Sequence, residues 1–377
     1  MDDGRGGVME QADWLAAVLR GECIDWPFGW GPRDCESVLL AAQAQGVSGM
    51  LLPRLDRYAD PASLPAALRP ALRRRVRGEA AAEFSRQIEC ERVLGLLAGA
   101  GLSALLMKGT ALAYSLYPEP HWRSRCDTDL LFADRDAASL ALEVFARDGY
   151  RPIPALGGTV LNHEVCCFKQ DRFGVTHSMD LHWAANNLPV FADLLPFAEL
   201  AAAAALLPRL GPHALGVAPV HGLLLACMHR LQHAPEGQSN RLIWLYDIHL
   251  LTAGFSAADW SAFSRLAMTR GVSGVCLAGL MAARRVFRST LPPGILEALT
   301  QAAAAEWLTP ARFATLRGQL IANLLALDDW GSRRRLVREH LFPDAAYLTQ
   351  TYGARQGWRL PLLYLRWIGS KIGKALR

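Results

Sequence analysis

Short apolar runs in the middle of the chain alternate with polar turns, and this pattern predicts strands. The run Leu105–Met107 is interrupted by Lys-Gly-Thr at residues 108–110, just before a helical pattern over residues 111–117. After a segment with two prolines and two arginines, an Asp-Thr-Asp triplet leads into a second apolar run at residues 130–132. This order predicts a strand, a tight turn, a helix and a second strand.

The alternation continues beyond the second strand. Residues 134–148 have helical periodicity, with Asp134 as the expected N-terminal cap. Residues 163–169 and 175–183 are predicted strands, separated by turn-forming residues. Residues 189–207 are rich in alanine and are predicted to form a connecting helix.

Both ends of the chain have helical periodicity instead. Residues 10–52 and 71–97 predict helices, with a break expected near Gly78. Beyond a Pro/Gly cluster, helical patterns cover residues 220–233, 241–252, 257–269, 275–289, 296–307 and 312–327. We therefore expect an α+β fold, with a mixed sheet and its helices flanked by N-terminal helices and a C-terminal all-helical domain. The expected divisions are residues 1–98, 99–207 and 208–377.

Composition narrows the class of protein only a little. The 377 residues are 51% hydrophobic and 20% charged, which is typical of a globular chain with a sizeable core. The net charge of +5 is compatible with anionic substrates but is too small to indicate a nucleic-acid binder. A cluster of four arginines within residues 73–77 is interpreted as a solvated helix face, with a nucleic-acid contact as the alternative.

Cysteine spacing and the chain ends bear on location. The eight cysteines form no C-x-x-C pair and no zinc-type spacing, so we expect reduced core thiols. Residues 1–14 do not look like a secretory signal, and no apolar segment approaches the roughly 20 residues of a spanning helix, so we expect a cytoplasmic protein without a transmembrane segment. The basic, apolar segment at residues 360–377 is expected to dock on the helical domain, with weak contact to an anionic membrane surface as the alternative.

Three acidic residues are the candidate chemistry. Asp127 and Asp129 lie two residues apart on a predicted strand, so both carboxylates share one face and repel unless a proton or cation intervenes. Asp180 lies inside another predicted strand, where a buried carboxylate needs a partner. Because neighbouring strands lie about 5 Å apart, Asp180 could complete a three-carboxylate site for Mg²⁺ or, alternatively, Mn²⁺. The alternative interpretation of the pair Asp127 and Asp129 is a solvated strand end. The alternative for Asp180 is an ion pair with Arg123 or Arg125.

The motifs, taken together, resemble a known family. They are Lys-Gly-Thr-Ala-Leu at 108–112, Tyr-Pro at 117–118, Arg125, Asp-Thr-Asp-Leu-Leu at 127–131, Gly-Tyr at 149–150, Asp-Leu-His-Trp at 180–183, His229 and Trp-Leu-Tyr-Asp-Ile at 244–248. Over about residues 90–260 the chain resembles the uncharacterised bacterial nucleotidyltransferase family of the polymerase-beta superfold. In that superfold a glycine and a small hydroxyl residue open a helix, an Asp-x-Asp follows on the next strand, and a third carboxylate comes from a later strand. Gly109 with Thr110, the Asp127 pair and Asp180 match this order, although the gap from Gly109 to Asp127 is longer than in the best-known members.

The resemblance implies a Mg²⁺-dependent nucleotidyltransferase, which moves an NMP from an NTP to an acceptor hydroxyl and releases pyrophosphate. Asp127 and Asp129 are then expected to bind two ions at the α-phosphate, and Asp180 to bind the ion that activates the acceptor or to act as its base. The acceptor stays open between a small hydroxylated molecule, an RNA end and a protein side chain. The alternatives are a catalytically silent nucleotide-binding or scaffold module and a toxin-like RNA-modifying transferase.

The same resemblance implies a nucleotide site around residues 108–110. Backbone N–H groups of Gly109 and Thr110 at a helix start would seat the triphosphate. Lys108 is expected to bind phosphate and to follow the leaving pyrophosphate, with a surface lysine at a strand end as the alternative. Arg123 and Arg125 are further expected nucleotide ligands. Of the two, Arg125 is favoured because it shares strand parity with the Asp pair.

One histidine is added to the expected site. His182 shares strand parity with Asp180, so its side chain is expected on the same face of the sheet. A contact with substrate or metal and a satisfied core histidine are equal alternatives for it.

Overall fold

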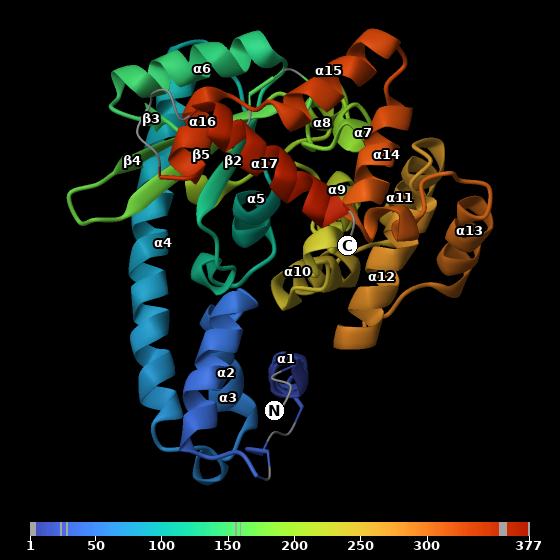
Figure 1. Cartoon of the computed structure of the whole chain (residues 1–377). Helices are drawn as coiled ribbons and strands as arrows, with labels where there is room; N and C mark the ends of the chain where they lie inside the picture. The colour runs from blue at the N-terminus through green and yellow to red at the C-terminus, as the bar shows by residue number, and fades with distance from the viewer. Residues whose placement is uncertain are drawn as a thin grey trace.

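The sheet and its helices form an α+β core between two helical regions, as predicted (Figure 1). The computed structural model describes residues 5–22, 25–27, 29–154, 157–158, 160–353 and 360–375. Within this part of the chain one seven-stranded mixed sheet has the order β3-β4-β5-β2-β1-β7-β6. Its strands are β1 (Leu105–Met107), β2 (Asp127–Leu131), β3 (Arg151–Pro152), β4 (Glu164–Gln170), β5 (Thr176–His182), β6 (Ala205–Leu206) and β7 (Leu215–Gly216).

The central strands are the predicted ones. β1 runs antiparallel to β2, and β2 runs parallel to β5, which in turn pairs antiparallel with β4. The predicted helix after β2 is α6 (Arg135–Arg147), and the carboxylate of its cap Asp134 accepts the backbone N–H of Ala137 at 2.8 Å. The helix after β1 is α5 (Lys108–Ser115), which begins three residues earlier than predicted.

The N-terminal region is a set of helices that leads into the sheet. They are α1 (Arg5–Arg20), α2 (Pro32–Ala44), α3 (Ser48–Tyr58) and α4 (Leu68–Gly99). Figure 1 shows α4 running along one edge of the molecule, from α2 and α3 up to the sheet. The expected break near Gly78 is wrong, because α4 is continuous over 32 residues. Gly78 is exposed, with open space around its α-carbon. Its low helix propensity costs about 1 kcal/mol relative to alanine. Burial of apolar side chains of the same helix, such as Leu72 and Cys90, offsets this cost.

The segment between the last predicted strand and residue 219 differs from the prediction. Instead of one helix over residues 189–207 the chain forms α7 (Pro189–Ala192), α8 (Phe197–Ala202) and the edge strand β6. Pro196 precedes α8 and lacks the N–H that a continuous helix would need, so the two helices stay separate. The Pro/Gly cluster that follows was not predicted to contain a strand, but β7 pairs with β1 and adds a strand to the sheet.

The C-terminal region is helical throughout. Its helices are α9 (Pro219–Gln232), α10 (Leu242–Ala253), α11 (Ala257–Thr269), α12 (Ser273–Phe287), α13 (Pro293–Ala303), α14 (Leu316–Ala326), α15 (Trp330–Leu341), α16 (Ala345–Thr351) and α17 (Leu360–Ala375). Short 3-10 turns occur at Pro61–Ser63, Pro120–Trp122, Pro208–Leu210, Ala234–Glu236 and Pro310–Phe313. α9 to α14 correspond to the six predicted helices, whereas α15 and α16 were not predicted. The expected division at residues 98 and 207 stays a prediction.

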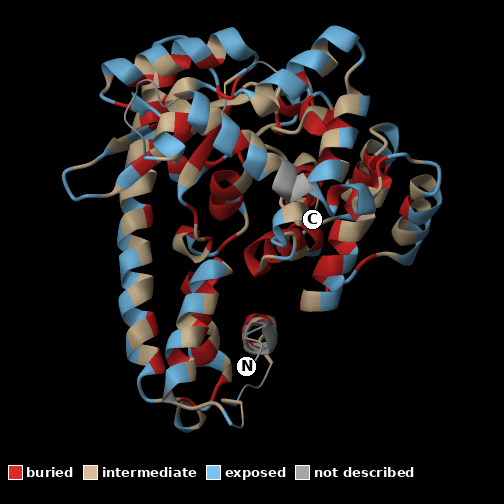
Figure 2. Cartoon of the chain, viewed as in Figure 1, coloured by how far each residue is buried: buried red, intermediate tan, exposed pale blue. Residues whose placement is uncertain are grey.

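Three apolar clusters hold the elements together. One face of the sheet packs through Leu130, Met179 and Leu181 on residues of α4 and α6. The other face contributes Leu105 and Leu131 to a large cluster with α9, α11 and α12. A third cluster joins α1 to α3 with α10. Figure 2 shows that α5 and α10 consist largely of buried residues, and α5 packs on β1 and β2.

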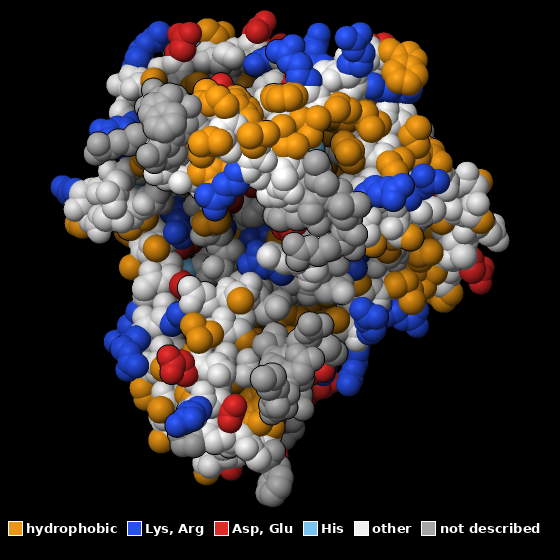
Figure 3. Space-filling model, viewed as in Figure 1, with side chains coloured by type: hydrophobic (Ala, Val, Ile, Leu, Met, Phe, Trp, Pro, Cys, Tyr) orange, Lys and Arg blue, Asp and Glu red, His pale blue; other side chains and the backbone are white. Residues whose placement is uncertain are grey.

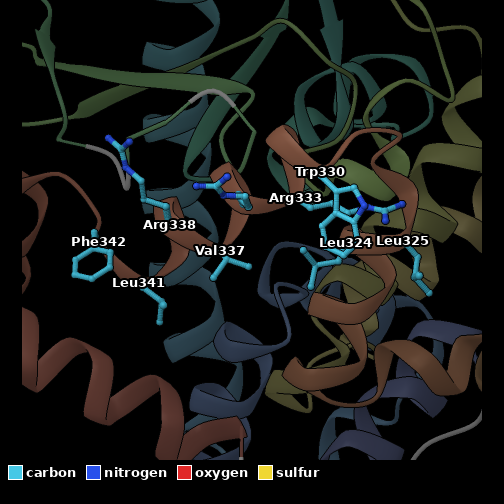
Figure 4. A pocket seen from close by; sticks show the side chains of 9 residues that line it. Leu324, Leu325, Trp330, Arg333, Val337, Arg338, Leu341 and Phe342 are labelled. Carbon is cyan, nitrogen blue, oxygen red and sulfur yellow. The ribbon is translucent and has the colours of Figure 1, made fainter.

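The last helices carry an exposed apolar surface (Figure 3). A groove of about 560 Å³ follows α14 and α15, and its lining includes Trp330, which is 75% exposed (Figure 4). The other lining residues are Leu324, Leu325, Arg333, Arg334, Val337, Arg338, Leu341 and Phe342. α17 docks on α14 to α16, where the indole N–H of Trp367 donates to the carbonyl of His340 at 2.9 Å. Within the described ranges no helix has the length and apolarity needed to cross a membrane.

Candidate active site

Asp129 and Asp180 lie side by side in the middle of the sheet. The parallel pairing of β2 and β5 puts their Cα atoms in register, and Asp127 pairs with Ser178 one step along the same face. Since alternate residues of a strand share a face, all three carboxylates point to the side opposite α4 and α6. The register thus brings Asp129 and Asp180 together, with Asp127 farther along the same face.

Three side chains are close enough to share one ion. Asp129, Asp180 and His182 each offer a ligand atom, and these atoms all lie within 4.8 Å of one another. Asp127 is outside this group although it lies on the same face. The geometric group thus contains two of the three expected metal ligands, together with the histidine that sequence parity placed beside them.

Lys108 folds back over this group from the end of β1. Its φ of 50° is in the left-handed region, which costs a non-glycine residue roughly 1–2 kcal/mol. Its ammonium lies 2.7 Å from Asp129 Oδ1 and 3.3 Å from His182 Nε2. Lys108 is therefore not a lysine at the surface of a strand end, but the cation that neutralises Asp129.

His182 connects the group to a fourth carboxylate. Its side chain is fully buried, with Nε2 at 2.9 Å from Asp129 Oδ1 and Nδ1 at 3.2 Å from Glu164 Oε2. Glu164 pairs with His182 in the register of β4 and β5 and was not predicted as a site residue. The signal was present in the sequence, because Glu164 lies near the start of a predicted strand, residues 163–169, that precedes the strand of Asp180.

The electrostatics of the site leave an excess of negative charge. Burial, followed by the charges of Asp129 and Glu164, raises the pKa of Asp180 to about 7. Burial and Asp129 also raise the pKa of Asp127. Burial opposes ionisation of Asp129 too, but Lys108 and His182 outweigh it and hold the pKa of Asp129 well below its usual range. Four carboxylates thus face a single ammonium, and Asp180 forms no ion pair with a described residue, which is the environment that a divalent cation neutralises.

Arg125 lies behind the carboxylates rather than among them. Its guanidinium forms a buried ion pair with Glu83 of α4, with Nη2 at 2.8 Å from Oε1. The same guanidinium donates to the hydroxyls of Thr110 and Thr128 at 3.1 and 2.8 Å, and to the backbone carbonyl of Asp127 at 2.8 Å. Arg125 therefore fixes the start of α5 relative to β2, and neither arginine forms an ion pair with Asp180 in the described structure.

Arg123 is held by the helical region. Asp247 of α10 accepts from its guanidinium at 2.7 Å and from the hydroxyl of Tyr117 at 2.7 Å. A Cβ on Gly109 would lie 3.1 Å from Arg123 Nη1, so the glycine gives this guanidinium room for its close approach. Gly109 and Thr110 form the first turn of α5, and both are buried. The contacts of Arg123 thus give Gly109 a packing role, whether or not the turn also seats a phosphate.

α9 and α10 border the site from the helical region. Burial and the nearby charge of Lys108 lower the pKa of His229 well below its usual value, which keeps this ring neutral. The ring of His229 packs on His233 and Trp244, with centroids 4.9 Å apart in each pair. His229 and His233 thus belong to an aromatic cluster, and Asp247 is engaged by Arg123.

The comparison with protein families agrees with this arrangement. A family model described as an uncharacterised nucleotidyltransferase matches residues 31–288, about two thirds of the chain. No curated protein matches the chain. The match covers β1 to β7 and α9 to α12, so it contains every residue of the site described above. The chain therefore belongs to the uncharacterised nucleotidyltransferase family, as its motifs predicted, and the family supports nucleotidyl transfer with a nucleotide as substrate.

Proposed function

We propose that the protein is a Mg²⁺-dependent nucleotidyltransferase that moves an NMP from an NTP to an acceptor hydroxyl and releases pyrophosphate. The observation that carries this proposal is the in-register pair Asp129 and Asp180 in a site where four carboxylates face one lysine. A structural role alone gives no reason to bury such an excess of negative charge, because buried charges are costly unless they are paired.

The donor set fits a hard divalent ion. We propose Asp127, Asp129 and Asp180 as the metal ligands and catalytic residues, with His182 as a further ligand or a substrate contact. Carboxylate oxygens are the ligands that Mg²⁺ prefers, and Mn²⁺ also accepts an imidazole. A bound ion would supply the positive charge that stabilises the reacting phosphate and lowers the pKa of the acceptor hydroxyl.

Asp180 is the proposed base or base-assisting residue. It is partly exposed, lacks an ion pair among the described residues, and has a pKa raised to about 7, close to the value at which a carboxylate accepts a proton most usefully. Asp129, by contrast, is held ionised by Lys108 and His182. The two neighbours are thus suited to different tasks, proton acceptance for Asp180 and permanent charge for Asp129.

Lys108 is the proposed phosphate ligand. Its ammonium neutralises Asp129, and a divalent ion on the carboxylates would release it toward the phosphates of the NTP. We propose that Gly109 and Thr110 form the turn next to the triphosphate. Arg123 and Arg125 are already bonded to Asp247 and Glu83, which supports a role for both in positioning this turn rather than in touching phosphate.

The test is a transfer assay with each labelled NTP and Mg²⁺, comparing wild type with Asp129→Ala and with Glu143→Gln as a surface control. The proposal expects pyrophosphate release that requires Mg²⁺, is lost in Asp129→Ala and is retained in the control. NTP binding without release would favour the catalytically silent nucleotide-binding module. Label appearing on RNA rather than on a small molecule or protein would favour the RNA-modifying transferase.

We also propose a cytoplasmic location. The cysteines within the described ranges are unpaired, and most of them are buried, as expected for reduced core thiols. Cys166 is half-buried, Cys126 next to Asp127 is exposed, and Cys23 lies outside the described residues. Mass spectrometry of thiol labelling on protein isolated under acidic quench would test the reduced state.

A further inference from the structure

A second charged feature lies on α9, next to His229 in sequence. Arg230 is 93% shielded from solvent, yet it forms no ion pair with any described carboxylate. Its Nη2 donates to Asn240 Oδ1 at 2.7 Å, whereas its Nε and Nη1 are buried without a hydrogen-bond partner. Buried polar groups are normally hydrogen-bonded, and a buried charge normally has a counter-charge. The guanidinium of Arg230 lacks a counter-charge among the described residues and has one hydrogen bond, so its burial is costly.

The other buried arginines show what is missing. In the described structure Arg123 and Arg125 are buried to the same extent as Arg230, and each contacts a carboxylate within 2.8 Å. Arg230 has only an amide oxygen. The last turn of α9, where Arg230 lies, presents partial negative charge but provides no acceptor for the two orphan donors.

Arg284 and Arg285 line the same pocket as Arg230. A cavity of about 610 Å³ between α9 and α12 is lined by Arg230, Ala278, Met281, Ala282, Arg284 and Arg285. Arg284 and Arg285 are exposed, and neither forms an ion pair with a described residue. Burial and the charge of Arg285 both lower the pKa of Arg230, and no carboxylate opposes this effect. The cavity thus concentrates positive charge from three side chains.

We propose that this cavity is an anion-binding site for the phosphate group of a small organic ligand, with Arg230 at its floor and Arg284 and Arg285 at its rim. Guanidinium groups bind phosphate through charge-assisted hydrogen bonds, and the buried charge of Arg230 has no counter-charge among the described residues. The apolar side chains of Ala278, Met281 and Ala282 would contact the organic part of the ligand. The site is independent of the proposed metal group, since it uses no carboxylate and no residue of the sheet.

The test is calorimetric titration of the full-length protein with inorganic phosphate in EDTA, so that binding through a divalent ion at the carboxylates is suppressed. Arg285→Gln removes an exposed rim charge without disturbing packing, and Arg230→Gln removes the floor. Arg265→Gln, on the exposed side of α11, is the matched control. The proposal expects saturable binding in wild type and in the control, with affinity reduced about 10- to 100-fold in each cavity variant.

Two results would overturn the proposal. One is that wild-type protein gives no heat of binding with phosphate, while its circular dichroism spectrum shows that it is folded. The other is equal binding in wild type, Arg285→Gln and Arg265→Gln, which would place the anion elsewhere. A glycerol phosphate titration beside inorganic phosphate then tests the organic part, because the apolar wall predicts tighter binding of the ester.

Discussion

Replacing Glu83 by glutamine should destabilise the protein far more than the loss of an ordinary ion pair. Glu83 is 5% exposed and accepts from Arg125 Nε and Nη2 at 3.1 and 2.8 Å, and from the Tyr114 hydroxyl at 2.9 Å. Glutamine keeps the shape and one acceptor oxygen but leaves the guanidinium of Arg125 buried without a counter-charge. Breaking a buried pair in this way costs about 3–5 kcal/mol, a large share of the about 5–15 kcal/mol that stabilises a typical protein.

Glu143→Gln is the matched control. Glu143 and Arg147 form an ion pair of 3.2 Å on α6, with side chains 62% and 77% exposed. Solvent screens such a pair, so its loss should cost less than about 0.5 kcal/mol. Urea unfolding followed by tryptophan fluorescence compares the two variants with wild type in free energy of unfolding.

The expected result is that Glu83→Gln unfolds at a urea concentration well below the midpoints of wild type and Glu143→Gln. Arg125 also bonds Thr110, Thr128 and the Asp127 carbonyl, so the same variant should lose transferase turnover while its fold is intact at low temperature. If the free energy of unfolding of Glu83→Gln lay within about 0.5 kcal/mol of that of the control, the reasoning would be refuted. The buried pair would then contribute no more to stability than a surface ion pair.

Three further changes test other parts of the structure. Burial raises the pKa of Glu79 from 4.5 to about 7 against the opposing charges of Arg75 and Arg86, so its stabilising contribution is complete below about pH 4.5 and is lost as pH rises through 7. The melting temperature of wild type relative to Glu79→Gln should therefore fall between pH 5 and 8, and a pH-independent difference would contradict this. Gly109→Ala should cost about 1–3 kcal/mol in thermal unfolding because its Cβ would lie 3.1 Å from the guanidinium of Arg123, which Asp247 holds, whereas Gly294→Ala, at an exposed position of α13 with open space around it, should not destabilise the protein. The alternative interpretation of residues 360–377, weak contact with an anionic membrane, should appear as co-sedimentation with anionic vesicles that high salt and Leu365→Ser reduce, and no sedimentation at low salt would remove that alternative.

Much of the site could be predicted from the sequence, because the alternation of side chains along a strand and the spacing between strands depend on local geometry. Parity put Asp127 and Asp129 on one face, and a second acidic strand made Asp180 their natural neighbour, which the register of β2 and β5 confirms. His182 followed from the same rule. The α+β class was likewise confirmed, because the change from helical to alternating periodicity near residue 101 is strong.

Other features depend on contacts between residues far apart in the chain. Glu83 and Asp247 determine where Arg125 and Arg123 point, and each lies more than 40 residues from its partner, so parity along one strand could not reveal them. β6 and β7 have two residues each, too few for a periodic signal. α15 is rich in arginine and poor in apolar residues, and its start is marked by the cap at Asp329.

The central claim is that Asp129 and Asp180 hold a divalent cation together with the nucleotide. Titration of Mn²⁺ followed by electron paramagnetic resonance, with a non-hydrolysable NTP present, measures this directly in wild type, Asp180→Asn and Glu143→Gln. The account predicts that wild type and Glu143→Gln bind Mn²⁺ equally and that Asp180→Asn binds at least about tenfold more weakly. Equal affinity in all three proteins would contradict it.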